Sequence, residues 1–314
     1  MTTTAKKAPA TMIPTGAGWN IPGEGIPMEK RTFEIMFTAF SLATNPNNKQ
    51  IYSDYIASRA PEGVDIEDEI AALGEDEYKG KQLCIFKKGD FYYDEAADRY
   101  IDVQSNDTNL TEEEITARGL KLVTNVPFVN DYQWRGMFKD SCGLLNRAES
   151  VDETGKKTAT TESSKLKAYK KVIDGGIFVY PRRIAIQVPE CYIDEDNCTV
   201  LNTYDEDGKL TVVERPLRIS GPTGERSAIA SSEMVPVGST MKFTVGVTNP
   251  KFWAVIEEWL NYGAVHGFSG WRNSGAGTFV WRMLKDDYTP YTEEELKELV
   301  SGSKKHGRKV AAKA

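Results

Sequence analysis

The sequence predicts an α+β fold, and the order of its regular segments along the chain is the main reason. Six segments have the periodicity of a strand or a helix, and they are 31–40, 131–145, 176–188, 239–247, 249–263 and 278–284. Once two long intervening segments are set aside, the six read strand, helix, strand, strand, helix, strand. That order is the β-α-β-β-α-β plan of a ferredoxin-like fold. We therefore expect a ferredoxin-like (RRM-like) core that carries two large insertions.

The strand segments alternate apolar and polar residues, which is the pattern of a strand with one buried face. In the first strand segment the apolar positions are Phe33, Ile35, Phe37 and Ala39. In the segment 239–247 they are Met241, Phe243, Val245 and Val247. The segment 176–188 is predicted to be a strand or a strand pair broken at Pro181, because proline donates no hydrogen bond to a ladder.

The two helical segments have apolar stripes at helical spacing. In 131–145 the stripe is Trp134, Met137, Phe138, Ser141 and Leu145, with Arg135 and Lys139 on another face. In 249–263 it is Phe252, Ile256, Trp259 and Leu260. Asn249 is the expected N-cap of this second helix, Pro250 its first residue and Gly263 its end.

The two insertions cover about 41–130 and about 189–238. In the first we expect a helix over 65–74, a hairpin that turns at Gly89 and Asp90, and a helix with a Thr111/Glu114 capping box. In the second we expect a hairpin that turns at 207–208. The polar segment 151–167 is predicted to be an exposed loop. These boundaries give a flexible arm over 1–28, a single domain over 29–290, and a C-terminal helix with a basic tail over 291–314.

Composition narrows the classes of function. The chain has 314 residues, is 40% hydrophobic and has a net charge of −7, which argues against a generically basic nucleic-acid-binding protein but allows local basic grooves. No apolar run is long enough for a membrane helix, and the first residues lack the apolar region of a secretory signal. The four cysteines form no CxxC pair, which indicates a reduced, cytoplasmic protein. The sequence predicts no cofactor, no metal and no membrane partner.

The segment 267–279, GFSGWRNSGAGTF, is the most unusual in the chain. Its glycines, Gly267, Gly270, Gly275 and Gly277, allow backbone N–H groups to approach another chain or a phosphate. Arg272 adds a cation, Asn273 an amide and Trp271 a stacking surface. The alternative is a loop that turns tightly around its own core with Trp271 buried. The loop is neither a Walker nor a Rossmann loop, because no GK[ST] follows and a strand comes next.

Three segments resemble the RAMP superfamily of CRISPR-associated proteins, in particular the backbone subunits that line guide RNA. The Gly-rich stretch 263–283 is similar to the loop that this family places before its last core strand. The stretch 130–142 is similar to the family's first helix, and 226–245 to a Ser/Thr-rich segment that runs through a P-x-G turn into a core strand. The resemblance implies that the insertions form lobes that grip RNA and neighbouring subunits. No position is matched to the loop aspartate with which some members cleave target RNA.

The function that this resemblance implies is binding without catalysis, by a subunit that oligomerises along RNA or single-stranded DNA. The partners would be the nucleic acid, copies of the chain in a head-to-tail assembly, and other effector-complex subunits. The candidate phosphate contacts are Arg135, Lys139, Lys165, Lys167, Lys170, Arg182, Arg183, Arg226 and Arg272, with Trp271 and Asn273 beside them. Each of these cations could equally be part of an ordinary solvated surface.

Two other classes of function stay open. The acidic balance fits a self-assembling structural or interaction protein, of phage origin for example, that binds no nucleic acid. A nuclease could use His266 or a loop carboxylate as an acid or base, although a lone histidine in a loop more often makes a structural hydrogen bond.

Overall fold

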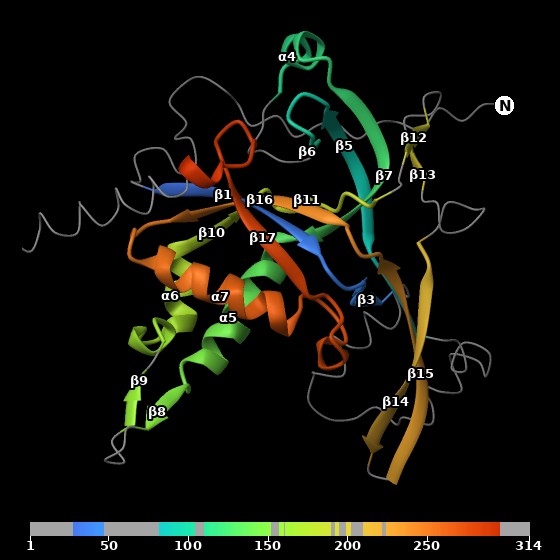
Figure 1. Cartoon of the computed structure of the whole chain (residues 1–314). Coiled ribbons are helices and arrows are strands. Elements are labelled where there is room, and N and C mark those ends of the chain that lie inside the picture. The colour runs from blue at the N-terminus through green and yellow to red at the C-terminus, as the bar shows by residue number, and fades with distance from the viewer. Residues whose placement is uncertain are drawn as a thin grey trace, which may run out of the picture.

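The computed structural model describes residues 28–46, 82–103, 110–151, 157–159, 161–189, 192–194, 199–201, 210–221 and 224–295. These residues form antiparallel sheets with few helices, so the prediction of an α+β fold is confirmed. A four-stranded sheet lies at the centre, with helices on one side and two further sheets around it (Figure 1).

The central sheet has the strand order β10-β16-β1-β17. Its strands are β10 (Ile177–Tyr180), β16 (Thr240–Val247), β1 (Glu29–Phe37) and β17 (Phe279–Leu284). Every neighbouring pair is antiparallel. The apolar positions that alternate along β1 and β16 are buried, as the period of two requires. The two middle strands are therefore the strands with the strongest sequence pattern.

Three helices cover one face of this sheet (Figure 1), and they are α5 (Asp131–Leu145), α6 (Tyr169–Gly176) and α7 (Phe252–His266). Trp134 of α5 lies at the centre of the core, with ring centroids 4.1 Å from Phe243 and 4.6 Å from Phe268. The helices α5 and α7 approach closely at Gly263, where an added Cβ would lie 2.9 Å from the sulfur of Met137. Aromatic packing and this glycine contact together fix both helices on the sheet.

A second sheet has the order β12-β13-β7-β5-β6, with β11 paired to β7. Its strands are β5 (Lys87–Asp94), β6 (Arg99–Asp102), β7 (Lys121–Asn130), β11 (Arg183–Ala185), β12 (Tyr192–Asp194) and β13 (Thr199–Leu201). Its own small core is Phe91, Val123, Val126 and Phe128. The short helix α4 (Glu112–Ala117) joins β6 to β7 and begins with the predicted Thr111/Glu114 capping box.

The third sheet has the order β14-β15-β4-β3, with β2 also paired to β15. Its strands are β2 (Ser41–Leu42), β3 (Asn45–Pro46), β4 (Gln82–Ile85), β14 (Val212–Gly221) and β15 (Gly224–Val235). The hairpin of β14 and β15 extends away from the central sheet (Figure 1). A separate small hairpin joins β8 (Glu149–Val151) to β9 (Lys157–Ala159).

Several local predictions are wrong. Gly89 and Asp90 form no turn, because both lie inside β5 and the chain turns later, at residues 95–98. Gly89 is needed instead for the close approach of Arg183, whose Nη1 would lie 2.8 Å from an added Cβ. The polar segment 151–167 is not a simple loop, since it contains β9 and the 3-10 turn η1 (Ser163–Lys165).

The second long helix is displaced from its predicted bounds. It begins at Phe252, because Asn249 folds into a turn in which its carbonyl accepts from Phe252. It continues past Gly263 to His266, since Gly263 serves helix packing and Gly267 caps the helix. The segment broken at Pro181 does divide as predicted, with β10 in the central sheet and β11 in the second.

Other predictions lie outside the described residues: residues 1–27 of the N-terminal arm, the helix over 65–74, the turn at 207–208 and the tail beyond residue 295. The start of the C-terminal helix is described, and Thr292 and Glu295 cap it reciprocally. No described helix is long and apolar enough to cross a membrane.

Candidate nucleic-acid interface

The outward face of α5 carries two of the predicted cations. Trp134 and Phe138 point into the core, so the helical period turns Arg135 and Lys139 away from it. Arg135 forms an ion pair with Asp131 at 2.8 Å, and the Nζ of Lys139 lies 2.5 Å from a carboxylate oxygen of Asp174 in α6. Both cations therefore have a carboxylate partner in the structure.

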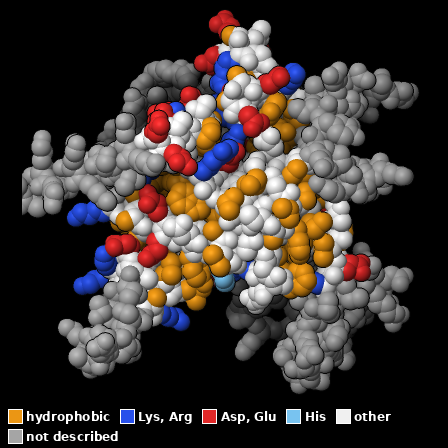
Figure 2. Space-filling model, viewed as in Figure 1, with side chains coloured by type: hydrophobic (Ala, Val, Ile, Leu, Met, Phe, Trp, Pro, Cys, Tyr) orange, Lys and Arg blue, Asp and Glu red, His pale blue; other side chains and the backbone are white. Residues whose placement is uncertain are grey.

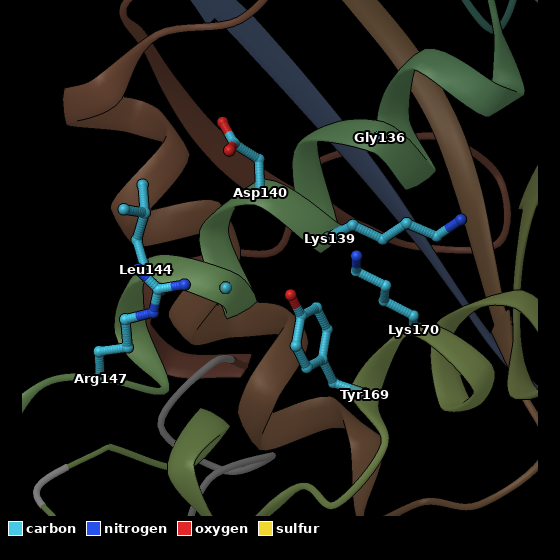
Figure 3. Close-up of a pocket in the computed structure, with 8 residues that line it drawn as sticks. Gly136, Lys139, Asp140, Leu144, Arg147, Tyr169 and Lys170 are labelled. Carbon is cyan, nitrogen blue, oxygen red and sulfur yellow. The ribbon is translucent and has the colours of Figure 1, made fainter.

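A cavity of about 590 Å³ opens between α5 and the start of α6. It is lined by Gly136, Lys139, Asp140, Gly143, Leu144, Arg147, Tyr169 and Lys170. Lys139 and Lys170 lie on one side of the Tyr169 ring and Arg147 on the other (Figure 3). The hydroxyl of Tyr169 would lie 3.0 Å from a Cβ added at Gly143, so this glycine makes room for the ring. Within the described part of the chain, Lys170 and Arg147 have no carboxylate partner.

Asp140 connects this cavity to the Gly-rich loop. Its carboxylate pairs with the guanidinium of Arg272, and the Nε2 of His266 lies 3.7 Å away. The ring of His266 stacks on Tyr262 with centroids 5.1 Å apart. The arrangement places Arg272 beside the cavity, and it gives His266 a packing role. The described residues contain no group of three His, Cys, Asp or Glu that could hold a metal ion.

The glycines of the loop mostly serve its own folding. Gly267 has φ +93° and an added Cβ there would lie 2.3 Å from the Ala276 carbonyl oxygen; at Gly277, with φ +74°, it would lie 2.0 Å from that of Phe268. Gly270 bridges to Leu42, which ties the loop to β2 and so to the third sheet. Gly275 also has a left-handed φ, +82°, but of these four glycines it is the one whose added Cβ would meet no atom. Most of these glycines are therefore explained by the alternative stated above, a loop that turns tightly around its own core.

The remaining loop candidates are at the surface. Trp271 is 38% exposed and lies against Arg215, whose guanidinium carbon is 5.3 Å from the ring centroid. Asn273 is exposed within the short turn η2 (Arg272–Ser274). Trp271 and Asn273 thus lie at the surface beside Arg272, and their part in binding stays a prediction.

The other predicted cations are scattered. Lys165 pairs with Glu162, whereas Lys167 and Arg182 are exposed. Arg183 is only 14% exposed and forms a bidentate ion pair with Asp102, which is 2% exposed. Its guanidinium also packs on the rings of Phe91 and Phe128. Because its guanidinium is paired with Asp102 and packed against these two rings, Arg183 is not part of the interface proposed below.

Arg226 lies in β15 opposite Ile219 of β14, near the tip of the long hairpin. Its side chain is outside the described part of the structure.

The face of the central sheet opposite the helices is closed by charges that the sequence did not single out. Glu34 pairs there with Arg282 and Lys242, and Lys242 also pairs with Asp98 of the turn between β5 and β6 at 3.1 Å. Figure 2 shows acidic and basic side chains intermixed at the top of the molecule, where α4, β5 and β6 lie. Asp98 also accepts hydrogen bonds from Gln187 and Tyr93. The sheet face therefore offers no open platform of aromatic rings for bases.

Hydrogen bonds at the Asp98 turn shift two pKa values. Burial opposes ionisation of Asp98, but hydrogen bonds from Lys242, Gln187 and Tyr93 outweigh it and hold the pKa of Asp98 below its usual value. Burial and the hydrogen bond to Asp98 raise the pKa of Tyr93 to about 12. The turn is thus held on the sheet by an ionised carboxylate.

Two residues of the cavity, Arg147 and Tyr169, were missed by reasoning from the sequence. Arg147 lies beyond Leu145, where α5 ends, so the helical period does not place it on the face of Lys139. Tyr169 gives no sequence signal either, because its position depends on how α6 docks on α5.

Comparison with known proteins gives limited similarity. No family model matches the chain, and no curated protein matches it. Among solved structures, the chain is similar to a chain of the Type III-B Cmr-beta complex bound to cognate target RNA, with a TM-score of 0.35 and 8% identity over 82% of this chain and 61% of that one. It is also similar to a chain of a Type IV-B CRISPR complex, with a TM-score of 0.34 and 9% identity over 84% of this chain and 94% of that one. Scores this low leave family and function to be argued from the site.

Proposed function

We propose that the chain is a non-catalytic subunit that binds single-stranded nucleic acid, RNA in the first instance, along the α5–α6 cavity and the adjoining Gly-rich loop. The observation that carries this proposal is that Lys139, Lys170 and Arg147 line one cavity and that Arg272 lies at its rim, where it pairs with Asp140. Three different parts of the chain supply these cations, on a protein whose net charge is −7. Their convergence gives a local basic surface for phosphates despite the acidic total.

The proposal extends to the fold. The segments β1, α5, β10, β16, α7 and β17 follow one another in the β-α-β-β-α-β order, and the sheet order β10-β16-β1-β17 supports a ferredoxin-like core of the RAMP type. The second and third sheets would then be the lobes inserted into that core. A subunit of this kind would assemble head to tail along the strand with copies of itself and with other subunits.

Binding is tested by fluorescence anisotropy with the full chain and a short, unstructured, labelled RNA, between about 50 and 200 mM salt. Each phosphate contact that is lost should reduce the slope of log K against log salt by about 0.7 for a single strand. Replacing both Lys139 and Lys170 by glutamine is therefore expected to reduce it by about 1.4. The matched control is Lys121→Gln, which removes an exposed cation from β7.

Several results of these titrations decide between the proposal and its alternatives. A wild-type chain that binds no RNA at low salt would overturn it, as would a control variant that loses as much affinity as the double variant. A complex whose protein stoichiometry grows with RNA length supports the strand-lining arrangement. Large assemblies without nucleic acid would favour the structural alternative, and the same titrations with DNA of equal sequence separate the two nucleic acids.

A further inference from the structure

Trp271 is presented at the surface by an unfavourable backbone conformation. Its φ of 58° and ψ of 33° are left-handed, a region that bulky side chains rarely occupy, and Ser269 has a φ of 74°. Hydrogen bonds hold this shape: the Ser269 hydroxyl donates to the Leu42 carbonyl at 2.6 Å, and the Ser274 hydroxyl to that of Trp271 at 2.9 Å. Backbone strain of this kind persists only where the surrounding structure imposes it, and it gathers at ligand sites.

The exposure of Trp271 contrasts with that of the core tryptophans. Trp271 is 38% exposed, whereas Trp134 and Trp259 are fully buried and Trp253 is 4% exposed. Phe40 supports the indole, with a centroid 6.4 Å away. The strained backbone of the loop thus keeps the Trp271 ring partly exposed to solvent.

Arg215 of β14 supports the same ring from the third sheet. Its guanidinium carbon lies 5.3 Å from the indole centroid, within cation–π range. The Nε of Arg215 is enclosed by the protein and has no hydrogen-bond partner among the described residues. Arg215 therefore contributes to this site through the cation that it holds beside the indole.

We propose that Trp271 and Arg215 form a nucleobase-stacking site, in which an unpaired base stacks on the open part of the indole and Arg215 faces the base or its phosphate. This inference rests on the proposed function and adds a contact that does not depend on net charge. A flat ring backed by a guanidinium suits a base, which offers a π-face and an adjoining negative charge. An aromatic or proline side chain of a protein partner offers the π-face without the charge.

The position of the stacking site in the chain agrees with this assignment. Arg272, the next residue, turns to Asp140 at the rim of the α5–α6 cavity. Asn273 is exposed one residue further on and can reach the edge of a base. A strand that passes over η2 could therefore place phosphates toward α5 and one base on Trp271.

The test compares two substitutions of the ring in the same anisotropy titration. Trp271→Leu is expected to weaken RNA binding by about 5- to 150-fold, which is the usual contribution of one stacked base. The loss should be the same at every salt concentration, because stacking releases no counterions. Trp271→Phe, which keeps a ring, should retain most of the affinity, and an RNA with abasic positions should bind wild type and Trp271→Leu alike.

The outcomes separate this inference from the proposed function. If Lys139→Gln/Lys170→Gln changes the salt slope but Trp271→Leu binds like wild type, the stacking site is refuted and the basic interface stands. If Trp271→Leu loses self-association but not RNA binding, Trp271 serves a protein contact and the stacking site is again refuted. Should Trp271→Leu fail to fold, ultraviolet crosslinking of 5-iodouridine RNA to wild type decides: a crosslink mapped to Trp271 supports the site, and crosslinks elsewhere overturn it.

Discussion

Replacing Gly277 by alanine should destabilise the protein far more than the same change at Gly275, although both glycines lie in one loop. Both have left-handed φ angles, +74° and +82°. A left-handed alanine costs about 1–2 kcal/mol, and the lower chain entropy of unfolded alanine offsets about 0.4–1 kcal/mol of it. Gly275→Ala is therefore expected to cost between about 0 and 1.6 kcal/mol.

Gly277→Ala carries an additional penalty. Its Cβ would lie 2.0 Å from the Phe268 carbonyl oxygen and 2.9 Å from the Phe268 nitrogen, so backbone must move. The movement breaks the hydrogen bond from the Phe268 N–H to the Gly277 carbonyl, 2.8 Å long, and displaces a ring that stacks on Trp134. One lost hydrogen bond costs about 0.5–1.5 kcal/mol and a disturbed core packing about 1–3 kcal/mol. These two terms add about 1.5–4.5 kcal/mol to the cost of the left-handed alanine.

Urea unfolding followed by circular dichroism measures both variants against wild type, on the condition that the m-value is unchanged. We expect the free energies of unfolding of the two variants to differ by at least about 1.5 kcal/mol. Equal losses would show that the Gly-rich loop does not pack on itself, and its glycines would then be free for a ligand.

Three further predictions concern ionisable groups. Arg183→Leu removes the guanidinium that pairs with the buried Asp102 and should cost about 3–5 kcal/mol in urea unfolding, and a double variant with Asp102→Leu should recover much of it; a single variant as stable as wild type would contradict the packing role of the pair. Because the pKa of Asp98 is lowered in the fold, its stabilisation is present above the ordinary value and is lost as pH falls through the lowered one. The difference in stability between wild type and Asp98→Asn should therefore shrink below about pH 4, and a constant difference would refute the ionised contact. Burial raises the pKa of the Cys142 thiol to about 11, so mass spectrometry should find it unmodified by iodoacetamide in native protein and modified in urea; rapid native modification would contradict its burial.

The elements that depend on neighbouring residues could be predicted from the sequence. Thr111 and Glu114 satisfy each other's backbone N–H groups across three residues, so the start of α4 needs no distant partner. The alternation of Phe33 and Ile35 likewise indicates the buried face of β1 whichever strands flank it. Local hydrogen bonds and periodicity carry this information by themselves.

Contacts between distant segments explain the errors. Gly89 has the signature of a turn, yet it lies inside β5 because Arg183, far along the chain, passes over it. Gly263 has the signature of a helix end, yet α7 continues because Met137 of α5 needs the space. A glycine in the sequence shows only that no side chain is present. The packing decides whether a turn or a close neighbour requires that absence.

The same division holds for the candidate interface. The sequence by itself determined the kinds of side chain available: the cations on one face of α5, the basic residues before α6, and a glycine loop with one tryptophan. Only the tertiary structure decided that Lys139 and Lys170 share a cavity, that Arg183 forms an ion pair with Asp102, and that Arg215 lies beside Trp271. The physical reason is range, because periodicity and capping act within a few residues, whereas a binding surface is made by side chains that packing brings together from distant parts of the chain.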